Sequence, residues 1–355
     1  MQTKRAWIMF LGVMFGVMIG LILFQIQSIT GFQVFDVDKT IKPNEGLCSG
    51  IEDTSEKSCC NDPYECLVKV GDNYHIKDWN RFISFNLIDT LKIGFFPPNS
   101  TRIMNGWVEE LLPSYAKINS DGFRGRDYSV NKPQNTSRII LLGDSFVYGY
   151  GLNDTETIAY KLENELNKDV NGHFFEVLNL GVGGYNTEME MKRFFEKGEK
   201  YNPDYIILFY FRNDYEDYNA HMNFWTILRD KYNVTGISAG KIIESQLLPS
   251  YYRYLYQSFS KNQIFNEKVF FHYKKLISYC KENNIDLLFV AYPADKIDQN
   301  ILKKFFVKED VNSFFLTEIG YKYIYPWTIG KIDYHPSSYA NERVVKEIVN
   351  KFFNK

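Results

Sequence analysis

The chain has 355 residues, of which 45% are hydrophobic and 24% charged. These values are ordinary for a folded protein, and they exclude wholesale disorder, collagen and low-complexity polymers. The 41 Lys and Arg residues nearly balance the 43 Asp and Glu residues, giving a formal charge of −2. Electrostatics therefore gives no reason to expect nucleic acid as the main partner. The length predicts about two domains, or one large α/β domain with attachments.

The N-terminus carries an apolar segment from Trp7 to Ile26, in which Gln25 is the one polar side chain. About 20 residues at ~1.5 Å rise span roughly 30 Å, the thickness of a hydrocarbon core. Because Lys4 and Arg5 precede the segment, the positive-inside rule predicts a single-pass anchor with a cytoplasmic N-terminus and an extracytoplasmic remainder. A cleaved signal peptide is the alternative, but its apolar region is normally shorter.

Three glycines recur at four-residue spacing in this segment: Gly12, Gly16 and Gly20. Such spacing lets two transmembrane helices approach closely. A homodimer through the anchor is therefore one interpretation. The other is that glycine is simply common in membrane helices.

Four cysteines lie close together after the apolar segment: Cys48, Cys59, Cys60 and Cys66. In an extracytoplasmic segment they predict two disulfides, with three possible pairings. A zinc site is the alternative, but the spacing lacks the paired C-x2-C hooks of common zinc ribbons. The fifth cysteine, Cys280, lies in an apolar helical pattern that predicts a buried side chain.

The chain is predicted to divide into three parts. Residues 1–30 form a cytoplasmic tip and transmembrane anchor, residues 31–136 a Cys-containing juxtamembrane segment and cap, and residues 137–355 an α/β domain with an insertion at about 215–263. The insertion is rich in aromatic side chains, which predicts either a wall that stacks on sugar rings or a helical pair with ordinary core aromatics. These aromatic residues are Tyr218, Phe224, Trp225, Tyr232, Tyr251, Tyr252, Tyr254 and Tyr256.

From Arg138 onward, short apolar runs alternate with helical patterns. Strands are predicted at 139–142, 174–178, 205–211 and 285–292, with a fifth at 321–325. Helices are predicted at 157–167, 188–200, 264–282 and 339–352. This alternation predicts a parallel sheet that is covered on both faces.

Residues that can carry chemistry follow the ends of the predicted strands. Ser145 follows the first strand in a Gly-Asp-Ser sequence, Gly184 ends a glycine-rich run after the second, and Asn213 follows the third. Asp333 and His335 precede the last helix. Because ligands bind beyond the carboxyl ends of the strands in such folds, we expect these groups to meet at one edge.

These residue types suit acyl transfer through a serine nucleophile. His335 can take the proton of Ser145, and Asp333 can orient the imidazole. The backbone N–H groups of Ser145 and Gly184 and the side-chain amide of Asn213 can form an oxyanion hole. The remaining histidines show no ligand spacing, so no metal or cofactor is predicted.

The four motifs, in this order, resemble the blocks of the SGNH (GDSL) hydrolase family over about residues 118–355. Residues 119–125 (Asn-Ser-Asp-Gly-Phe-Arg-Gly) also resemble the segment before Gly-Asp-Ser in membrane-anchored or secreted members. The resemblance implies a three-layer α/β/α, flavodoxin-like fold. It also implies the namesake roles for Ser145, Gly184, Asn213 and His335.

Two positions depart from the family pattern. Phe211 stands where the third block usually has glycine, which predicts a reshaped pocket floor. The last block is Asp-x-His in place of the frequent Asp-x-x-His, so Asp333 is the least secure assignment. Asp295 and Asp298 remain alternatives, as does a Ser–His dyad with a backbone carbonyl partner.

Two neighbours of the motifs carry weaker predictions. Asp144 is interpreted as stabilising the nucleophile turn without a catalytic role. Arg212, next to Asn213, is a candidate contact for an anionic substrate group. Gly181 and Gly183 are interpreted as structural.

Together these patterns predict a membrane-tethered serine esterase that acts on acylated glycans of the cell surface or secreted material, or on small esters. Acetyl is one candidate acyl group, and the sequence leaves the chain length open. An O-acyltransferase that passes the acyl group to a sugar hydroxyl is the alternative within this class. A catalytically inactive glycan-binding or assembly protein is the alternative from another class.

Overall fold

The computed structural model describes residues 63–70, 72–76, 98–104, 113–168, 172–234, 238–239, 242–330 and 333–353. Its contacts divide the chain into Met1–Gly50 and Ile51–Lys355, and all the described residues belong to the second unit. The predicted anchor, its glycines and three of the clustered cysteines lie outside the described residues. Within the described ranges, no helix combines the length and apolar character that a membrane crossing requires.

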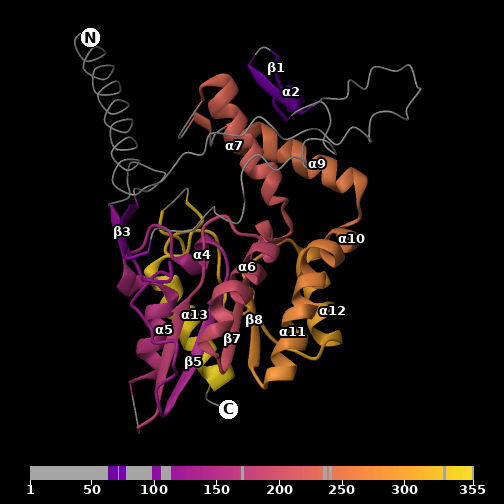
Figure 1. Cartoon of the computed structure of the whole chain (residues 1–355). Helices are drawn as coiled ribbons and strands as arrows, with labels where there is room; N and C mark the ends of the chain where they lie inside the picture. The colour runs from indigo at the N-terminus through magenta and orange to yellow at the C-terminus, as the bar shows by residue number, and fades with distance from the viewer. Residues whose placement is uncertain are drawn as a thin grey trace, which may run out of the picture. The chain divides into compact units, whose positions relative to one another are not determined.

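A five-stranded parallel sheet organises the second unit (Figure 1). Its strands are β5 (Thr136–Leu142), β6 (Phe174–Asn179), β7 (Tyr205–Tyr210), β8 (Asp286–Ala291) and β9 (Asn312–Phe315), in the spatial order β6-β5-β7-β8-β9. In the register of the three neighbouring strands, Ile139 lies between Val177 and Tyr205. The order second, first, third, fourth, fifth is that of flavodoxin-like doubly wound sheets. The predicted fold class is confirmed in this respect.

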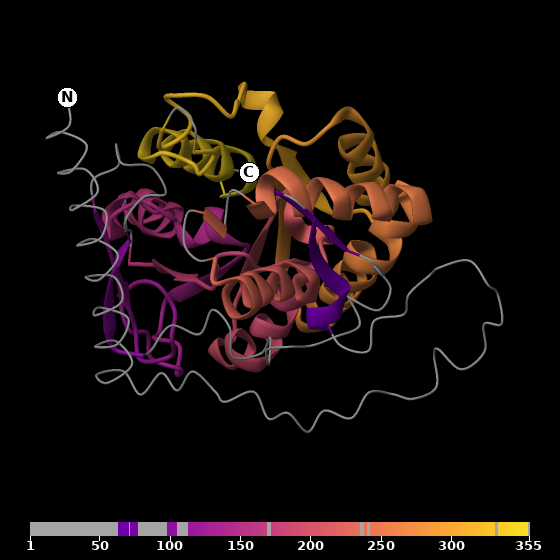
Figure 2. The ribbon, with the colours of Figure 1, turned by 90° about the horizontal axis from the view of Figure 1, so that it is seen from above.

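Helices cover both faces of the sheet (Figure 2). On one face lie α5 (Ile158–Leu166) and α13 (Ser338–Ile348). On the other lie α6 (Thr187–Arg193), α11 (Phe271–Asn283) and α12 (Lys296–Lys308). The sheet is therefore the middle of three layers.

The central residues of the strands are mostly apolar because both faces of the sheet are buried. Successive side chains of a strand point to opposite sides of a sheet. Ile139 and Leu141 of β5 accordingly belong to the apolar cluster under α5 and α13, whereas Ile140 and Leu142 belong to the cluster under α6 and α11. This two-sided burial explains why the first predicted strand reads as a continuous apolar run.

The predicted insertion is a series of helices between β7 and α11. They are α7 (Tyr218–Tyr232), η5 (Ile243–Leu247), α9 (Leu248–Ser258), α10 (Lys261–Phe265) and η6 (Asn266–Phe270). Phe224 and Tyr251 are buried in the same cluster as the sheet. Their burial favours core packing over sugar stacking for these two residues, while the side chains of Tyr218 and Trp225 lie outside the described residues.

Two antiparallel hairpins precede the sheet in the chain. The first joins α2 (Pro63–Cys66), β1 (Leu67–Val70) and β2 (Asn73–Ile76), and the second pairs β3 (Ser100–Met104) with β4 (Ser114–Ile118). The first hairpin binds the insertion, since Tyr232 Oη donates to the Leu67 carbonyl at 2.9 Å. Cys66 is buried and in a disulfide, but its partner lies outside the described residues, so the predicted pairings stay predictions.

The fifth predicted strand, at 321–325, is wrong. The fifth strand is β9, and residues 321–325 form a loop after η7 (Leu316–Ile319). Tyr321 is buried, and Tyr323 Oη donates to the Pro293 carbonyl at 2.7 Å. The alternating aromatic pattern therefore reflects side chains that pack inward from a loop, not a pleated strand.

Short helical turns complete the described structure. They are α4 (Ser145–Tyr148), η1 (Asp154–Glu156), η2 (Phe194–Gly198), η3 (Glu199–Tyr201), η4 (Arg212–Tyr215) and η8 (Val349–Phe353). Two of them, α4 and η4, follow the adjacent strands β5 and β7. They therefore lie beyond the carboxyl ends of the two strands between which the sheet order reverses, where ligands bind in doubly wound folds.

Candidate active site

Ser145 is the first residue of the one-turn helix α4 at the carboxyl end of β5. Asp144 is the N-cap of this helix, and its Oδ1 accepts a hydrogen bond from the Phe146 N–H at 2.9 Å. Gly149 ends the helix with a φ of 83°, a conformation that glycine adopts without a steric penalty. The turn thus holds the half-buried Ser145 at the edge of the sheet.

Ser145, His335 and Asp333 form a continuous chain of hydrogen-bonding groups. His335 Nε2 lies 2.9 Å from Ser145 Oγ, and His335 Nδ1 lies 2.7 Å from Asp333 Oδ1. The same Asp333 oxygen accepts the backbone N–H of His335 at 2.9 Å. Residues 190 positions apart in the sequence therefore meet as the sequence predicts.

The charge on Asp333 suits this arrangement. Asp333 is 8% exposed, and burial by itself raises the pKa of its carboxyl. The hydrogen bond and charge of His335 outweigh burial, so the pKa lies below its usual value. An ionised Asp333 favours a proton on Nδ1, which leaves Nε2 free to accept the hydroxyl proton of Ser145.

The two alternative acids lie elsewhere. Asp295 caps the N-terminus of α12, and both Asp295 and Asp298 bind the ammonium group of Lys261, at 2.5 and 2.6 Å. Within the described part of the chain, the His335 ring has polar contacts with Ser145 and Asp333 alone. The geometry therefore favours Asp333 over the alternatives that the sequence left open, including a backbone carbonyl.

Asn213 lies in η4, beyond the end of β7. Its Nδ2 donates to Asp144 Oδ2 at 3.0 Å and approaches the Tyr185 carbonyl at 3.4 Å. Asp144 therefore uses one oxygen to cap α4, the helix of Ser145, and the other to hold the amide of Asn213. The sequence predicted the first of these contacts but not the second.

Asp144 is enclosed, with 3% of its surface exposed. Burial raises the pKa of its carboxyl, while the Phe146 N–H, the charge of His335 and the amide of Asn213 oppose that rise. The groups that oppose the rise are members of the site. Asp144 is thus an electrostatic link between the helix of Ser145 and the turn of Asn213.

The glycine-rich run after β6 completes this edge. A Cβ added to Gly181 would lie 2.4 Å from the Tyr148 N atom, and one added to Gly183 would lie 3.8 Å from Ser145 Cβ. Gly184 follows with a φ of 80°. Gly181 is structural as predicted, since it permits close approach to α4. Gly183 also adjoins the nucleophile, which the sequence did not indicate.

Two backbone donors remain available at the site. Among the described residues, neither the Ser145 N–H nor the Gly184 N–H donates a hydrogen bond to another group. Both follow strands whose carboxyl ends meet at this edge. The donors that the sequence predicts for an oxyanion are therefore at the same carboxyl-terminal edge of the sheet as Ser145.

Aromatic rings pack around His335. The Phe146 and Tyr150 rings have centroids 5.2 and 4.7 Å from that of the imidazole. Phe211 packs on Phe146, with ring centroids 4.2 Å apart. These contacts restrict the imidazole from two sides. Phe146 and Tyr150 were not identified from the sequence, because aromatic residues are frequent throughout the chain.

The segment at 119–125 contacts the C-terminal end of α4 through Arg124. The guanidinium of Arg124 donates to the carbonyls of Tyr148, Gly149 and Leu152 at 3.0, 2.6 and 2.6 Å. It also pairs with Asp154 at 2.9 Å. The carbonyls at the end of the short α4 therefore receive donors from a buried side chain.

A second Ser–His pair lies at the opposite end of β5. Ser137 Oγ is 2.9 Å from His173 Nε2, the same separation as in the predicted site. Within the described ranges, no carboxylate binds the His173 ring. Among the residues that the structure describes, this pair has neither a third member nor a glycine-rich run beside it.

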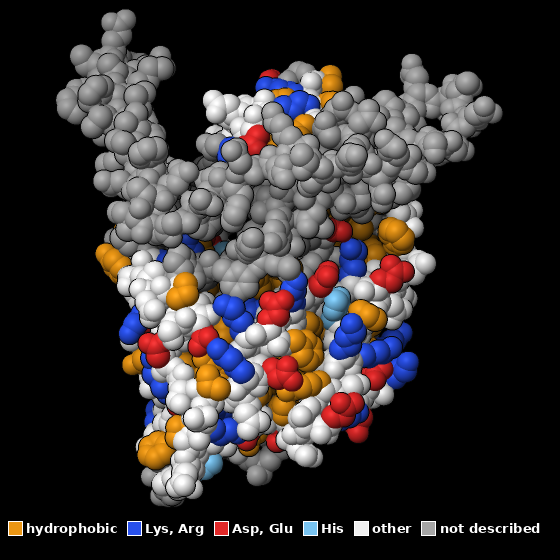
Figure 3. Space-filling model, viewed as in Figure 1, with side chains coloured by type: hydrophobic (Ala, Val, Ile, Leu, Met, Phe, Trp, Pro, Cys, Tyr) orange, Lys and Arg blue, Asp and Glu red, His pale blue; other side chains and the backbone are white. Residues whose placement is uncertain are grey.

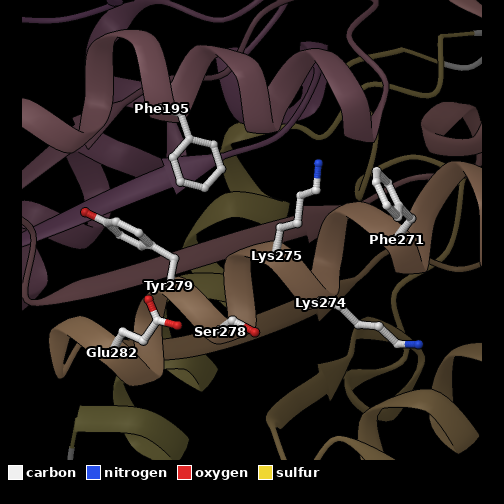
Figure 4. Close-up of a pocket in the computed structure, with 7 residues that line it drawn as sticks. All are labelled: Phe195, Phe271, Lys274, Lys275, Ser278, Tyr279 and Glu282. Carbon is white, nitrogen blue, oxygen red and sulfur yellow. The ribbon is translucent and has the colours of Figure 1, made fainter.

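One surface groove lies away from these residues. It has a volume of about 480 Å³ and runs between η2 and α11 (Figure 4). Its lining residues are Phe195, Phe271, Lys274, Lys275, Ser278, Tyr279 and Glu282. None of them belongs to the predicted site. The molecular face in Figure 3 mixes acidic and basic side chains, with hydrophobic ones between them.

No family model matches this chain, and no curated protein matches it. Solved structures of similar fold include three esterases. They are AlinE4, an SGNH-hydrolase family esterase (18% identity, TM-score 0.36, 63% of this chain and 98% of that one), the acetyl xylan esterase AlAXEase (17%, 0.38, 61% and 99%), and the psychrotrophic esterase EstA from Pseudoalteromonas sp. (12%, 0.41, 62% and 100%). At such low identity, the chemistry of this chain is argued from its own residues.

Proposed function

We propose that this chain is a serine esterase that works through an acyl-Ser145 intermediate. The observation that carries the proposal is the Ser145–His335–Asp333 chain, with separations of 2.9 and 2.7 Å. Hydroxyl, imidazole and carboxylate in this geometry can activate a nucleophile that is weak on its own. The oxyanion donors on the same edge supply the second requirement of acyl transfer.

The first half of the reaction acylates the enzyme. Ser145 Oγ attacks the ester carbonyl carbon while His335 Nε2 accepts the hydroxyl proton. The carbonyl oxygen becomes an oxyanion, and the N–H groups of Ser145 and Gly184 bind it. Asn213 keeps one amide N–H on Asp144 and turns the other from its long, 3.4 Å contact with the Tyr185 carbonyl to the oxyanion. When the oxyanion collapses, the C–O bond to the alcohol breaks, and His335 gives its proton to the departing alkoxide.

The second half releases the acid. Water attacks the acyl carbon, and His335 takes one of its protons. Collapse of the second oxyanion breaks the bond to Ser145 Oγ, which regains its proton from His335. Each oxyanion donor is expected to be worth roughly 10²–10³ in rate.

The finer proposal concerns substrate and location. The enzyme is tethered by residues 7–26 and acts outside the cytoplasm on O-acyl groups, such as acetyl, of cell-surface or secreted glycans. The apolar segment, the basic residues before it and the clustered cysteines support the location. The resemblance of residues 119–125 to membrane-anchored or secreted SGNH members supports it as well.

The location is tested with full-length protein in cells. An epitope tag placed after Lys355 should be removed by protease added outside the membrane, whereas a tag before Met1 should be protected. Protection of both tags would overturn the extracytoplasmic location. Release of the domain with its C-terminal tag, without added protease and without the N-terminal tag, would favour a cleaved signal peptide.

The enzymatic role is tested with a fluorophosphonate probe, which reacts with activated serines. Labelling should occur in the purified protein and disappear in Ser145→Ala. Ser137→Ala is the matched control, because it removes the other serine that lies 2.9 Å from a histidine, and it should label normally. No labelling of the folded protein would favour the inactive glycan-binding alternative.

Hydrolase and transferase are distinguished by the product. The protein is incubated with an acyl donor and an oligosaccharide acceptor, and the products are resolved by mass spectrometry. Release of free acid with unmodified acceptor supports the esterase. Acylated acceptor that requires Ser145 would identify the protein as an O-acyltransferase instead.

A further inference from the structure

Arg212 is a charged side chain at the edge that carries the proposed chemistry. It lies in η4, directly before Asn213, and it is exposed. The adjacent amide contacts Asp144 and so is fixed relative to Ser145. The backbone of Arg212 is therefore held directly beside a proposed oxyanion donor.

The positive charge of Arg212 acts on groups from more than one element beside this edge. Burial raises the pKa of Glu216, Tyr252 and Tyr323, and the positive charge of Arg212 opposes the rise in each. Tyr252 belongs to α9 of the insertion. Tyr323 belongs to the loop before His335 and packs against Tyr334, with ring centroids 6.0 Å apart. Arg212 is thus near groups from both sides of the edge.

Among the described residues, the Arg212 guanidinium forms no hydrogen bond and no ion pair. Glu216 is the acid nearest to it in sequence, but its carboxylate accepts the hydroxyl of Tyr252. Burial raises the pKa of Glu216 to about 7, so near neutral pH this neighbour carries only part of a negative charge.

We propose that Arg212 binds an anionic group of the substrate, so that the natural substrates are esters on acidic glycans. A carboxylate, sulfate or phosphate near the acylated oxygen has the chemistry that the planar guanidinium recognises through paired N–H donors. This inference rests on the proposed esterase function and narrows it from acylated glycans in general to acidic ones. Phe211, packed on Phe146, fixes the backbone from which Arg212 extends.

The test compares two small esters of nearly equal shape. One is 3-carboxyphenyl acetate, which is anionic, and the other is 3-carbamoylphenyl acetate, in which a neutral amide replaces the carboxylate. The measured quantity is the ratio of their kcat/KM values at low ionic strength. Wild-type protein should prefer the carboxylate, and the preference should weaken with salt because exposed charges are screened.

Variants at Arg212 identify the source of the preference. Arg212→Gln should lower the ratio roughly tenfold, since hydrogen bonds to charged groups are the stronger ones. Arg212→Lys should give a ratio between those of wild type and Arg212→Gln, because lysine keeps the positive charge but lacks the paired N–H donors of the guanidinium. Arg343→Gln removes an exposed arginine of α13 and is the matched control, with the wild-type ratio expected.

The outcomes separate the two proposals. If wild type and Arg212→Gln hydrolyse both esters with the same ratio, the anionic subsite is wrong and the esterase function stands. If the fluorophosphonate probe fails to label Ser145 and neither ester is cleaved, the esterase function itself is wrong. A lowered ratio in Arg343→Gln as well would mean that overall charge, not Arg212, sets the preference.

Discussion

At the scale of single residues, Asp144 has an unusual double contact. One carboxylate oxygen accepts the Phe146 N–H and the other accepts the amide of Asn213. The nucleophile helix and the side-chain oxyanion donor are therefore positioned by the same group. A residue that the sequence predicts to stabilise only the turn of Ser145 thus connects two parts of the site.

Asp144→Asn tests this positioning role. The new side chain can still accept from Phe146, but where it presents its NH₂ to Asn213, two donors face each other. We expect kcat to fall by roughly 10²-fold, the value of one oxyanion donor, with little change in KM. Circular dichroism should show a folded protein, and an unchanged kcat would contradict the role.

Asp333→Asn tests the acid. The amide cannot hold the imidazole in the required tautomer, so kcat should fall by roughly 10³–10⁴. Asp295→Asn is the matched control, because Asp295 caps α12 and binds Lys261, and it should retain activity. If Asp333→Asn retained activity and Asp295→Asn lost it, Asp295 would be the acid that orients His335.

At the scale of elements, the helix that carries Ser145 is too short to be stable by itself. It has four residues, far fewer than an isolated helix needs in water. Its end is held by Arg124, whose side chain is 1% exposed. The segment at 119–125 is therefore a support for the nucleophile and lies outside the chemistry.

Arg124→Met should destabilise the fold by at least about 2 kcal/mol. Three buried carbonyl oxygens lose their donor, and each unsatisfied buried group costs roughly 1–3 kcal/mol. Arg126→Met is the control from the same segment. The Arg126 side chain is 49% exposed and pairs with Glu163, so its loss should cost less than about 1 kcal/mol. Urea denaturation followed by fluorescence measures both.

The strand ends could be predicted from the sequence because apolar runs in a two-sided sheet stop abruptly at polar loops. That rule located Ser145, Gly184 and Asn213 on one edge. It failed at 321–325, where buried Tyr321 and hydrogen-bonded Tyr323 give a loop the pattern of a strand. The rings around His335 could not be predicted, since packing across the chain leaves no mark on local periodicity.

At the scale of the whole molecule, two buried carboxyl groups affect the response to pH. Glu190 and Asp214 are each 1% exposed. Both Glu190 oxygens have no hydrogen-bond partner among the described residues, and neither does Asp214 Oδ1. Burial, followed by the charge of Asp214, holds the pKa of Glu190 well above its usual value; burial, followed by the charge of Asp144, does the same for Asp214.

The raised pKa of the Glu190 carboxyl makes the fold less stable as the pH rises. The folded state binds a proton that the unfolded chain releases above about pH 4.3, so the free energy of unfolding falls as pH rises through the interval up to the folded pKa. Glu190→Gln should flatten that fall and raise the melting temperature near pH 8. Glu188→Gln, exposed on the same helix, is the control and should follow wild type.

The proposed catalytic groups differ in how firmly the architecture secures them. Ser145 and Asn213 extend from β5 and β7, which are hydrogen-bonded neighbours in the sheet. His335 lies in a loop before α13, where the Ile329 N–H donates to the His335 carbonyl at 2.9 Å. We therefore expect substitutions that disturb residues 329–335 to misplace the proposed base while Ser145 and Asn213 keep their places at the ends of paired strands.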